Sequence, residues 1–436
     1  MMKKRVLIGI AVVFITGLIG YGYLAYRQKQ SYRQYIPANA SALFRINVDA
    51  LLQSIVWNAV SNPLYYFGSD KEKPKKPFEI NGLGLHIPAN VFFFSMEPYD
   101  ATLFSVFRID DFEKFEHYIK HGLNIKSVNT MDSLTFQGNT ADEKLCLLYS
   151  KEYLALSISA SKVATTTILR SLVLQNNMIA VEQSHLLDAI KANHELVYTN
   201  GTNTVIADFG PGTLSLKGQV KTNMIRGAEH IHPRRFTRNS LVKGWLAADV
   251  GPLLTRQQKF FEKHRIPVDT LLHYYGGYVD LEWKKNLILQ QDTVITYDYN
   301  ENFEKVEQKS IRKERIPEIY LSFQASPHLA NYLPKQLFYK FGHKSQGDRL
   351  LFGTGENYQQ NSLDGLSSNF FYFYIDIKGL KKQGNYPLLQ QYSKQVEKIE
   401  LKSQKLASQY MAVYGKLNFE NKSIHGLMQL LRSVPN

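Results

Sequence analysis

The chain has 436 residues, of which 44% are hydrophobic and 21% are charged. These proportions exclude a disordered chain and are typical of a folded globular protein. At about 150 residues per domain, the length predicts two or three domains with a core large enough to be stable without disulfides or metals. The single cysteine, Cys146, excludes an intramolecular disulfide and a thiolate metal cluster. Because it stands in the apolar run Leu145–Leu148, we interpret Cys146 as a small core hydrophobe.

Basic residues exceed acidic ones, 52 against 38, and give a formal net charge of +14. Part of this excess flanks the first apolar stretch of the chain. Another part lies between Lys217 and Lys243, where Glu229 is the only acid. Such a surface attracts anions of many kinds, including phosphate-bearing lipid and acidic polymers.

Residues Val6–Tyr26 form an uncharged, mostly apolar stretch (VLIGIAVVFITGLIGYGYLAY). At about 1.5 Å per residue, a helix of this length would extend roughly 31 Å, which is close to the thickness of a bilayer's hydrocarbon core. The alternative is a cleaved signal peptide. The stretch is longer than the apolar region of a signal peptide, and its end is crowded with tyrosines rather than with small residues.

The basic residues Lys3, Lys4 and Arg5 precede the stretch, which favours a cytoplasmic N-terminus. The sequence therefore predicts a cytoplasmic tail over residues 1–5 and a single-pass transmembrane signal-anchor over residues 6–26. It also predicts an extracytoplasmic, periplasmic body, and a body in that place has no nucleic-acid partner.

The body repeats one local pattern, in which an apolar or alternating strand ends at Asp, Asn or Ser and a helical pattern follows. A short side-chain oxygen at this point accepts hydrogen bonds from the unpaired N–H groups of the helix's first turn. We therefore interpret the junction residues as helix caps rather than as catalytic acids. They are Asp49, Asp110, Ser161, Asp249, Ser326 and Asp376.

Strand hairpins lie between these units, and their partial alternation is typical of sheets with one wet face. The pairs Leu145–Tyr149 with Tyr153–Ser159 and Tyr410–Phe419 with Ser423–Leu431 are examples, whereas residues 300–317 are charged and show no clear period. A division near Asn200 leaves three strand-to-helix units on each side. The predicted fold class is α+β, with one N-terminal transmembrane helix and then mainly antiparallel sheets with capped helices. The predicted domains are two halves of a duplicated body, residues 27–200 and 201–436.

The segment Tyr35–Ala40 (YIPANA), the strand through Asn47 and the helix from Leu51 resemble the start of certain exported bacterial envelope proteins that carry a domain of unknown function. The final segments, Tyr414–Phe419 and Ser423–Leu431, are similar to the way those proteins end. The resemblance implies a location in the cell envelope and no known activity, so it assigns no functional residue.

Two clusters have side chains suited to ligand binding. In Glu229–His232 (EHIH), both histidines would point the same way on a strand, as metal ligands do, but a third ligand is missing and the arginines that follow oppose a cation. We therefore predict no metal and no cofactor. Arg234, Arg235 and Arg238 are the candidate contacts to an anionic ligand or partner, because guanidinium groups match phosphate and carboxylate.

The chain contains no G-x-S-x-G elbow, no phosphate-binding P-loop and no H-E-x-x-H motif. We therefore predict a protein that is not an enzyme: a membrane-anchored binding or scaffolding element of the bacterial envelope. Its expected partners are the membrane, through residues 6–26, and an envelope protein or anionic envelope component. One alternative is an envelope hydrolase with a Ser or Asp beside a His in a deep pocket. The other is a sheet cradle for a lipid or an anionic glycan.

Overall fold

The computed structural model describes residues 18–68, 82–122, 125–130, 135–263, 267–299, 303, 305–332, 339–355, 364–384, 386–407 and 409–433. The chain divides into two compact units. Unit 1 comprises Met1–Pro211 with Ser423–His425, and unit 2 comprises Gly212–Lys422 with Gly426–Asn436. We predicted a division near Asn200, and the observed division lies at Pro211 and Gly212.

The structure is mostly antiparallel sheet, with strand at 44% against 28% helix. The predicted α+β class that begins with a transmembrane helix is therefore wrong. The charged residues Lys305–Pro317 show one reason: they have no apolar period that would predict a strand, yet they belong to a long strand over Lys305–Ala325.

Among the residues that the structure describes, no helix combines the length and apolar character needed to cross a bilayer. This finding overturns the predicted signal-anchor, and with it the single-pass membrane location that placed the N-terminus in the cytoplasm and the body in the periplasm. Residues 6–17 of that prediction lie outside the described residues. The described remainder belongs to a helix over residues 18–31, whose second half is polar and includes Arg27, which pairs with Asp49.

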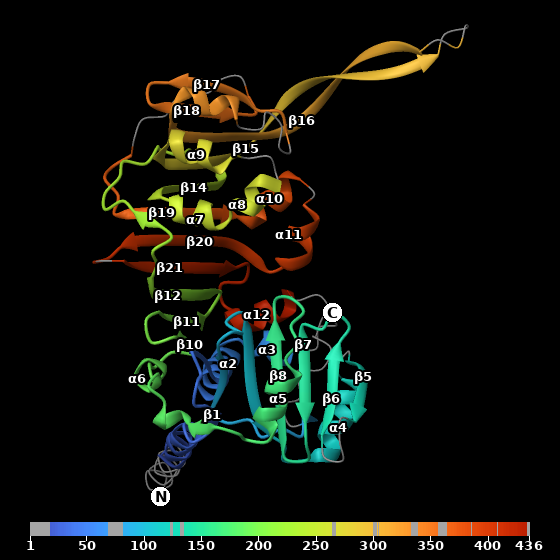
Figure 1. Ribbon diagram of the computed structural model, residues 1–436, viewed down its shortest axis with the longest axis vertical. Helices are drawn as coiled ribbons and strands as arrows, with labels where there is room; N and C mark the ends of the chain where they lie inside the picture. Colours follow the sequence, from blue (N-terminus) through green and yellow to red (C-terminus); the bar gives the residue numbers. More distant parts are fainter. Residues whose placement is uncertain are drawn as a thin grey trace, which may run out of the picture. The chain divides into compact units, whose positions relative to one another are not determined.

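Unit 1 contains one antiparallel sheet (Figure 1). From one edge to the other its strands are β11 (Thr204–Gly210), β10 (Leu196–Thr199), β2 (Ala42–Asn47), β3 (Asn90–Ser95), β4 (Thr102–Arg108), β8 (Tyr153–Ser159), β7 (Leu145–Tyr149), β6 (Phe136–Thr140) and β5 (Ile125–Thr130). A separate pair joins β1 (Tyr35–Pro37) to β9 (Met178–Ala180). The helices are α2 (Val48–Ser61), α3 (Pro63–Phe67), α4 (Phe112–His121), α5 (Thr166–Val173), η2 (Val181–Gln183) and α6 (Leu187–Ile190).

Helices cover both faces of the sheet at β7. Leu148 belongs to a cluster with Leu169 of α5, whereas its neighbours Leu147 and Tyr149 pack with Phe115 of α4. Burial on both faces explains why β7 is a continuous apolar run instead of an alternating one. Cys146 is a free, buried residue of the α5-side cluster, which confirms its interpretation as a core hydrophobe, and burial raises the pKa of its thiol.

Several junction residues are helix caps, although not always the predicted ones. Ser326 and Asp376 accept hydrogen bonds from backbone N–H groups of η3 (Pro327–Asn331) and α10 (Ile377–Gln383), as predicted. At the first two junctions the caps are Asn47 and Asp111 instead. The predicted caps there, Asp49 and Asp110, instead form ion pairs with Arg27 and Arg108, because the fold brings these arginines close to them.

Unit 2 is likewise built on antiparallel strands. Its strands follow the order β12 (Thr213–Lys221), β21 (Tyr410–Phe419), β20 (Val396–Lys405), β19 (Asn369–Asp376), β14 (Ser240–Asp249), β15 (Tyr275–Tyr299), β16 (Lys305–Ala325), β18 (Arg349–Gly353) and β17 (Gly342–Gln346), with β13 (Arg226–Gly227) paired to the end of β14. The helices are α7 (Gly251–Arg256), α8 (Gln258–Lys263), α9 (Val268–Tyr274), η3 (Pro327–Asn331), α10 (Ile377–Gln383), α11 (Pro387–Tyr392) and α12 (Gly426–Ser433). The strand predicted over Ser423–Leu431 is wrong, because α12 occupies most of that range.

Strands and helices follow one another in a similar order in the two units. In unit 1, β2 leads through α2 to β3 and β4, then through α4 to the hairpin β7–β8, whose second strand pairs with β4. In unit 2, β14 leads through α7, α8 and α9 to β15 and β16, then through η3 to the hairpin β17–β18, whose second strand pairs with β16. The corresponding hairpins β3–β4 and β15–β16 differ most in length.

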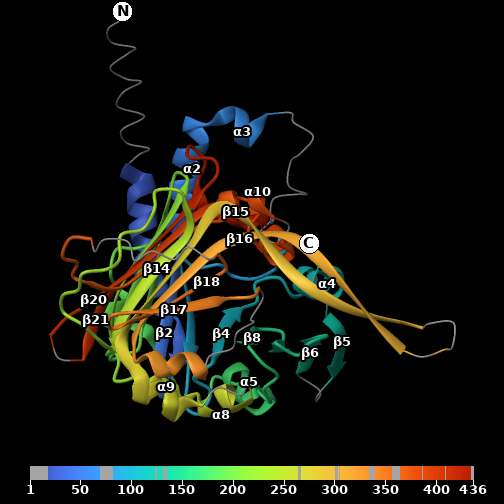
Figure 2. The same cartoon turned by 90° about the horizontal axis from the view of Figure 1, so that it is seen from above.

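The β15–β16 hairpin continues far beyond the sheet as a two-stranded ribbon, visible in two perpendicular views (Figures 1 and 2). We call this ribbon the arm and define it as the paired segments Leu287–Tyr299 and Lys305–Pro317. In unit 1 the corresponding link between β3 and β4 is the short segment 96–101, so this connection does not require an arm.

Candidate ligand-binding groove

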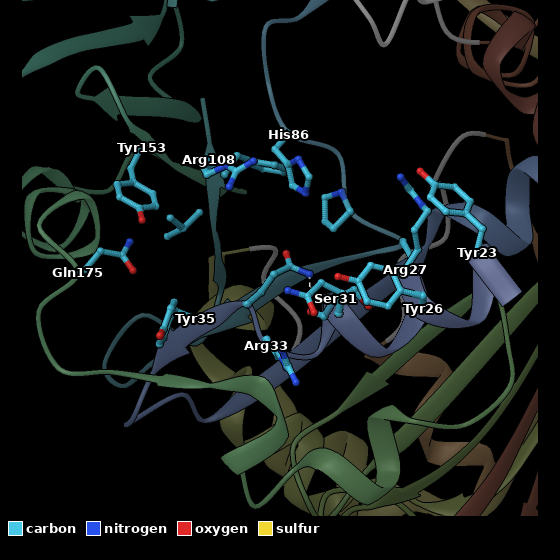
Figure 3. Close-up of a pocket in the computed structure, with 16 residues that line it drawn as sticks. Tyr23, Tyr26, Arg27, Ser31, Arg33, Tyr35, His86, Arg108, Tyr153 and Gln175 are labelled. Atoms are coloured by element: carbon cyan, nitrogen blue, oxygen red, sulfur yellow. Dashed lines mark hydrogen bonds between the residues drawn. The ribbon is translucent and has the colours of Figure 1, made fainter. Parts of the chain in front are cut away.

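A groove of about 440 Å³ lies in unit 1, between the helix over residues 18–31 and the sheet. Figure 3 shows its labelled side chains around an open space, with His86 and Arg108 on one side and Arg33 and Tyr35 on the other. Basic and aromatic residues dominate the lining, which contains Tyr23, Tyr26, Arg27, Gln30, Ser31, Arg33, Gln34, Tyr35, His86, Pro88, Ala89, Val106, Phe107, Arg108, Tyr153 and Gln175.

The helix that forms one wall is fixed to the body through Arg27. Its guanidinium donates from Nε and Nη2 to the two carboxylate oxygens of the buried Asp49, each at 3.0 Å, and from Nη2 to the Ile87 carbonyl at 3.3 Å. The hydrogen bond to Asp49 raises the pKa of Arg27, against the opposing effect of burial. A bidentate pair of this kind fixes orientation as well as charge, so this wall is preorganised.

Three polar groups fix the chain below the groove. Asn90 Nδ2 donates to Ser31 Oγ at 2.7 Å, and Gln34 Nε2 donates to the Asn90 carbonyl at 2.7 Å. Ser31 Oγ in turn donates to the Gln28 carbonyl at 2.7 Å. The Ser31 hydroxyl is buried and both donates and accepts a hydrogen bond, so it helps to fix the chain at this point.

The opposite wall combines two basic side chains with one acid. Arg108 donates from Nε and Nη2 to Asp110 Oδ1 at 3.0 and 2.8 Å, and His86 Nδ1 lies 3.1 Å from Asp110 Oδ2. Burial works to raise the pKa of Asp110, but the hydrogen bonds from Arg108 and His86 outweigh it and lower that pKa. Gly84 permits the turn before His86, because its φ is +67° and a Cβ there would stand 2.3 Å from the Asp111 carbonyl oxygen.

Cations exceed anions around the groove. Arg27 and Arg108 are matched by Asp49 and Asp110, whereas Arg33 is exposed and forms no ion pair among the described residues. No acidic side chain lines the groove in the part of the chain that the structure describes. The free charge of Arg33 can therefore hold an anion, and tyrosine rings can pack against the rest of a ligand.

The structure separates the three arginines that the sequence had grouped. Arg234 is buried, where Nε donates to Asp280 Oδ1 and Nη1 donates to Glu282 Oε2, both at 2.9 Å. Arg235 is exposed with Nε 3.8 Å from Asp364 Oδ1, and Arg238 is exposed as well. Arg234 therefore neutralises two buried carboxylates inside unit 2, and only Arg235 and Arg238 lie on the surface.

Among the described residues, no group of three or more His, Cys, Asp or Glu side chains could hold a metal ion. His230 and His232 are both exposed. The Nδ1 atom of His232 lies 3.3 Å from the Asp364 carbonyl oxygen. A third ligating side chain does not join them among those residues.

One cluster contains the residue types of a hydrolase triad. Ser54 Oγ lies 3.0 Å from His425 Nε2 and donates to Glu195 Oε1 at 2.8 Å. In a working triad the histidine stands between the nucleophile and the acid. Here the serine stands between them, and His425 Nδ1 is buried with no hydrogen-bond partner among the described residues. This arrangement joins α2 to the segment Ser423–His425 and does not line the groove described above.

The burial of His425 in this cluster predicts that the stability of unit 1 depends on pH. Burial lowers the pKa of His425. When the folded pKa lies below the unfolded value of about 6.5, unfolding takes up a proton in acid, so stability falls as the pH drops below about 6.5. The slope is at most about 1.4 kcal/mol per pH unit for one proton. Burial raises the pKa of Glu195, which acts in the opposite direction.

We expect His425→Gln to lose this acid dependence while retaining a polar partner for Ser54. The measurement is the free energy of unfolding at pH 7 and pH 5 for both proteins. Wild type should lose more stability than the variant over this interval. An equal loss in both proteins would show that His425 is not the titrating group.

Little in the sequence could have identified the residues that line the groove. Arg27 and Arg33 stand out only as the basic residues that follow the first apolar stretch, and Tyr35 stands out only within the segment that resembles envelope proteins. The other walls come from segments more than fifty residues away, as His86 and Arg108 illustrate.

No protein-family model matches the chain, and no curated protein matches it. Two solved structures show a distant likeness, each at 9% sequence identity. They are "Structure of crystal form III of TP0453", with a TM-score of 0.23 over 73% of this chain and 91% of that one, and "Structure of crystal form I of TP0453", with a TM-score of 0.22 over 73% of this chain and 90% of that one. A likeness at this level carries no argument about function.

Proposed function

We propose that this chain is a binding protein without catalytic activity, and that the groove of unit 1 holds a small ligand with one anionic group and a ring-shaped or apolar body. The observation that carries this proposal is the lining itself: three arginines and a histidine with tyrosines between them, and no carboxylate among the described lining residues.

The anionic part of the ligand is assigned to Arg33. The other two arginines of the groove each form two hydrogen bonds to a carboxylate, so their charge is already compensated. Arg33 has no such partner among the described residues and lies where the helix has ended, beside Tyr35 of β1. A charge-assisted hydrogen bond to an anion at this point is worth about 1.5–3 kcal/mol.

The ring-shaped or apolar part is assigned to the aromatic walls. Tyr26 and Tyr35 present exposed rings, and Val106, Phe107 and Tyr153 contribute half-buried surface from β4 and β8. Tyrosine combines a large apolar face with a hydroxyl at its edge, which suits a ligand that is partly apolar and partly polar. This chemistry fits an aromatic or sugar ring that carries a phosphate or a carboxylate.

The test uses 8-anilinonaphthalene-1-sulfonate, a fluorescent probe with apolar rings and one anionic group, titrated into the full chain. We expect Arg33→Glu to weaken binding of the probe by about tenfold or more, because a loss of 1.4 kcal/mol is tenfold. The matched control is Arg238→Glu, an equal charge change at an exposed arginine of unit 2, which should leave the affinity unchanged. Equal losses in the two variants would reject the groove as the site.

A second control addresses the probe's preference for exposed apolar surface. Helix α2 exposes Trp57, whose side chain is 71% accessible, outside the groove. We expect Trp57→Ala to leave the Arg33-dependent binding of the probe intact. In a separate competition experiment, we expect phenyl phosphate to displace the probe at a lower concentration than inorganic phosphate does. If Trp57→Ala removes the binding and Arg33→Glu does not, the groove proposal is wrong.

A further inference from the structure

The arm of unit 2 has two different faces, which follow from its register. Directly paired residues of antiparallel strands share a face, and successive residues along a strand lie on opposite faces. One face, here called the outer face, takes the odd-numbered residues from Leu287 on β15 and up to Pro317 on β16. The other, the inner face, takes the even-numbered residues, beginning with the pair Ile288 and Ile316.

The inner face is the one that packs at the base of the arm. Ile316 is 2% exposed, and Gln290 donates from Nε2 to the carbonyls of Lys340 and Thr354 at 2.8 and 3.3 Å. At the same level the outer face is open: Leu287 and Leu289 are 44% and 57% exposed, and Ile311 further out is 66% exposed. The outer face therefore presents aliphatic side chains that unit 2 itself does not cover.

The outer face is also basic. On β16 it carries Lys305, Lys309, Lys313 and Arg315 against the single acid Glu307. The described side chains of β15 on this face, Leu287, Leu289 and Gln291, are uncharged. Lys309, Lys313 and Arg315 are exposed and have no ion-pair partner among the described residues, so their charge is not compensated within that part of the chain.

The backbone of β16 offers a second binding element. Over Lys305–Pro317 this strand pairs with β15 on one side, and no strand of the described residues pairs with its other side. An open edge of this kind presents N–H and C=O groups to which an extended peptide can add as a further strand. The same strand thus combines an open edge with three uncompensated cations.

We propose that the arm binds an acidic, extended segment of a partner protein, which adds as a strand along the open edge of β16. This interaction surface is independent of the groove in unit 1. Lys309 and Lys313 are four residues apart, about 14 Å on a strand, and Lys313 and Arg315 are about 7 Å apart. A strand with acidic residues at alternate positions matches this spacing, because its same-face side chains also repeat about every 7 Å.

A polypeptide fits the outer face better than an anionic polymer does. A polymer such as heparin supplies charge, but it has no amide groups for the strand edge and no aliphatic side chain to cover Ile311 between Lys309 and Lys313. A peptide supplies all three kinds of contact. Cross-strand pairs of opposite charge add roughly 0.2–1 kcal/mol each.

The test uses the full chain and a fluorescein-labelled peptide, acetyl-TETETVTET-amide, whose acids and valine alternate with threonine so that they share one face. A shuffled peptide of the same composition, EEETVTTTT, is the probe control. The measurement is the dissociation constant from fluorescence anisotropy. We expect the alternating peptide to bind several-fold more tightly than the shuffled one.

The matched variants are Lys313→Glu on the outer face and Arg312→Glu on the inner face, which are neighbours with the same change of charge. We expect Lys313→Glu to weaken binding of the alternating peptide by roughly fivefold to tenfold and Arg312→Glu to change it by less than twofold. Circular dichroism of both variants verifies that these exposed changes leave the fold intact. The proposal fails if the two variants lose affinity equally, if the shuffled peptide binds as well, or if heparin binds through Lys313 more tightly than the alternating peptide does.

Discussion

Arg234→Met is expected to lower the free energy of unfolding of unit 2 by about 3–5 kcal/mol, because it leaves two carboxylates buried without their cation. Asp280 and Glu282 are 1% and 0% exposed, and Arg234 bonds to both. Methionine retains the volume of the arginine stem, so the loss reports charge rather than a cavity. The measurement is unfolding by denaturant followed through tryptophan fluorescence, since Trp245 and Trp283 both lie in the strands of this sheet.

The matched control is Arg235→Met, the same change at the next residue. Its side chain is 62% exposed and stands 3.8 Å from Asp364, a geometry that contributes little to stability. We expect a change within about 0.5 kcal/mol. If the two variants are equally stable, the buried pair is not the reason for the location of Arg234.

The pH dependence of Arg234→Met has a defined sign. Burial already raises the pKa of Asp280 in the wild type, and loss of Arg234 removes the main charge that opposes this effect. When a carboxyl has a higher pKa in the folded than in the unfolded state, the protein becomes less stable as the pH rises through the folded pKa. The deficit of the variant should therefore be smaller at pH 5 than at pH 8, and Asp280→Asn added to Arg234→Met should recover part of it.

The buried ion pairs also explain why the sequence wrongly grouped Arg234 with two surface arginines as one candidate contact. Arg234 and Arg235 are adjacent and chemically identical, so composition places them together. They separate because Thr237, Ser240 and Arg234 all direct hydrogen bonds to Glu282, more than forty residues away. Nothing local to residues 234–238 predicts this long-range pairing.

The fold was predictable where burial imposes a pattern. The strands Leu145–Tyr149 and Tyr153–Ser159 were predicted with the bounds that the structure shows, because helices cover them and their residues are strongly apolar. The second strand of the arm, Lys305–Pro317, was not predicted, because both of its faces are largely exposed over Lys305–Arg315 and no apolar period marks it. Helix α12 was mistaken for a strand, although Leu427, Leu430 and Leu431 have helical spacing.

Phe104→Ala is expected to destabilise unit 1 by about 3–5 kcal/mol, the range for removal of a fully buried aromatic side chain. Phe104 lies on β4 with 0% exposure, stacks with Phe94 of β3 at a ring distance of 6.2 Å, and meets Tyr99 edge-on at 6.1 Å. The measurement is the free energy of unfolding of unit 1 from hydrogen exchange of the β4 amides. The matched control is Phe67→Ala on α3, the same change at a residue that is 73% exposed, which should cost less than about 1 kcal/mol.

Because β4 and β8 also form one side of the groove, Phe104→Ala should weaken binding of the sulfonate probe under mildly denaturing conditions, whereas Phe67→Ala should not. Comparable losses in the two variants would mean that the core of unit 1 is not organised around β4.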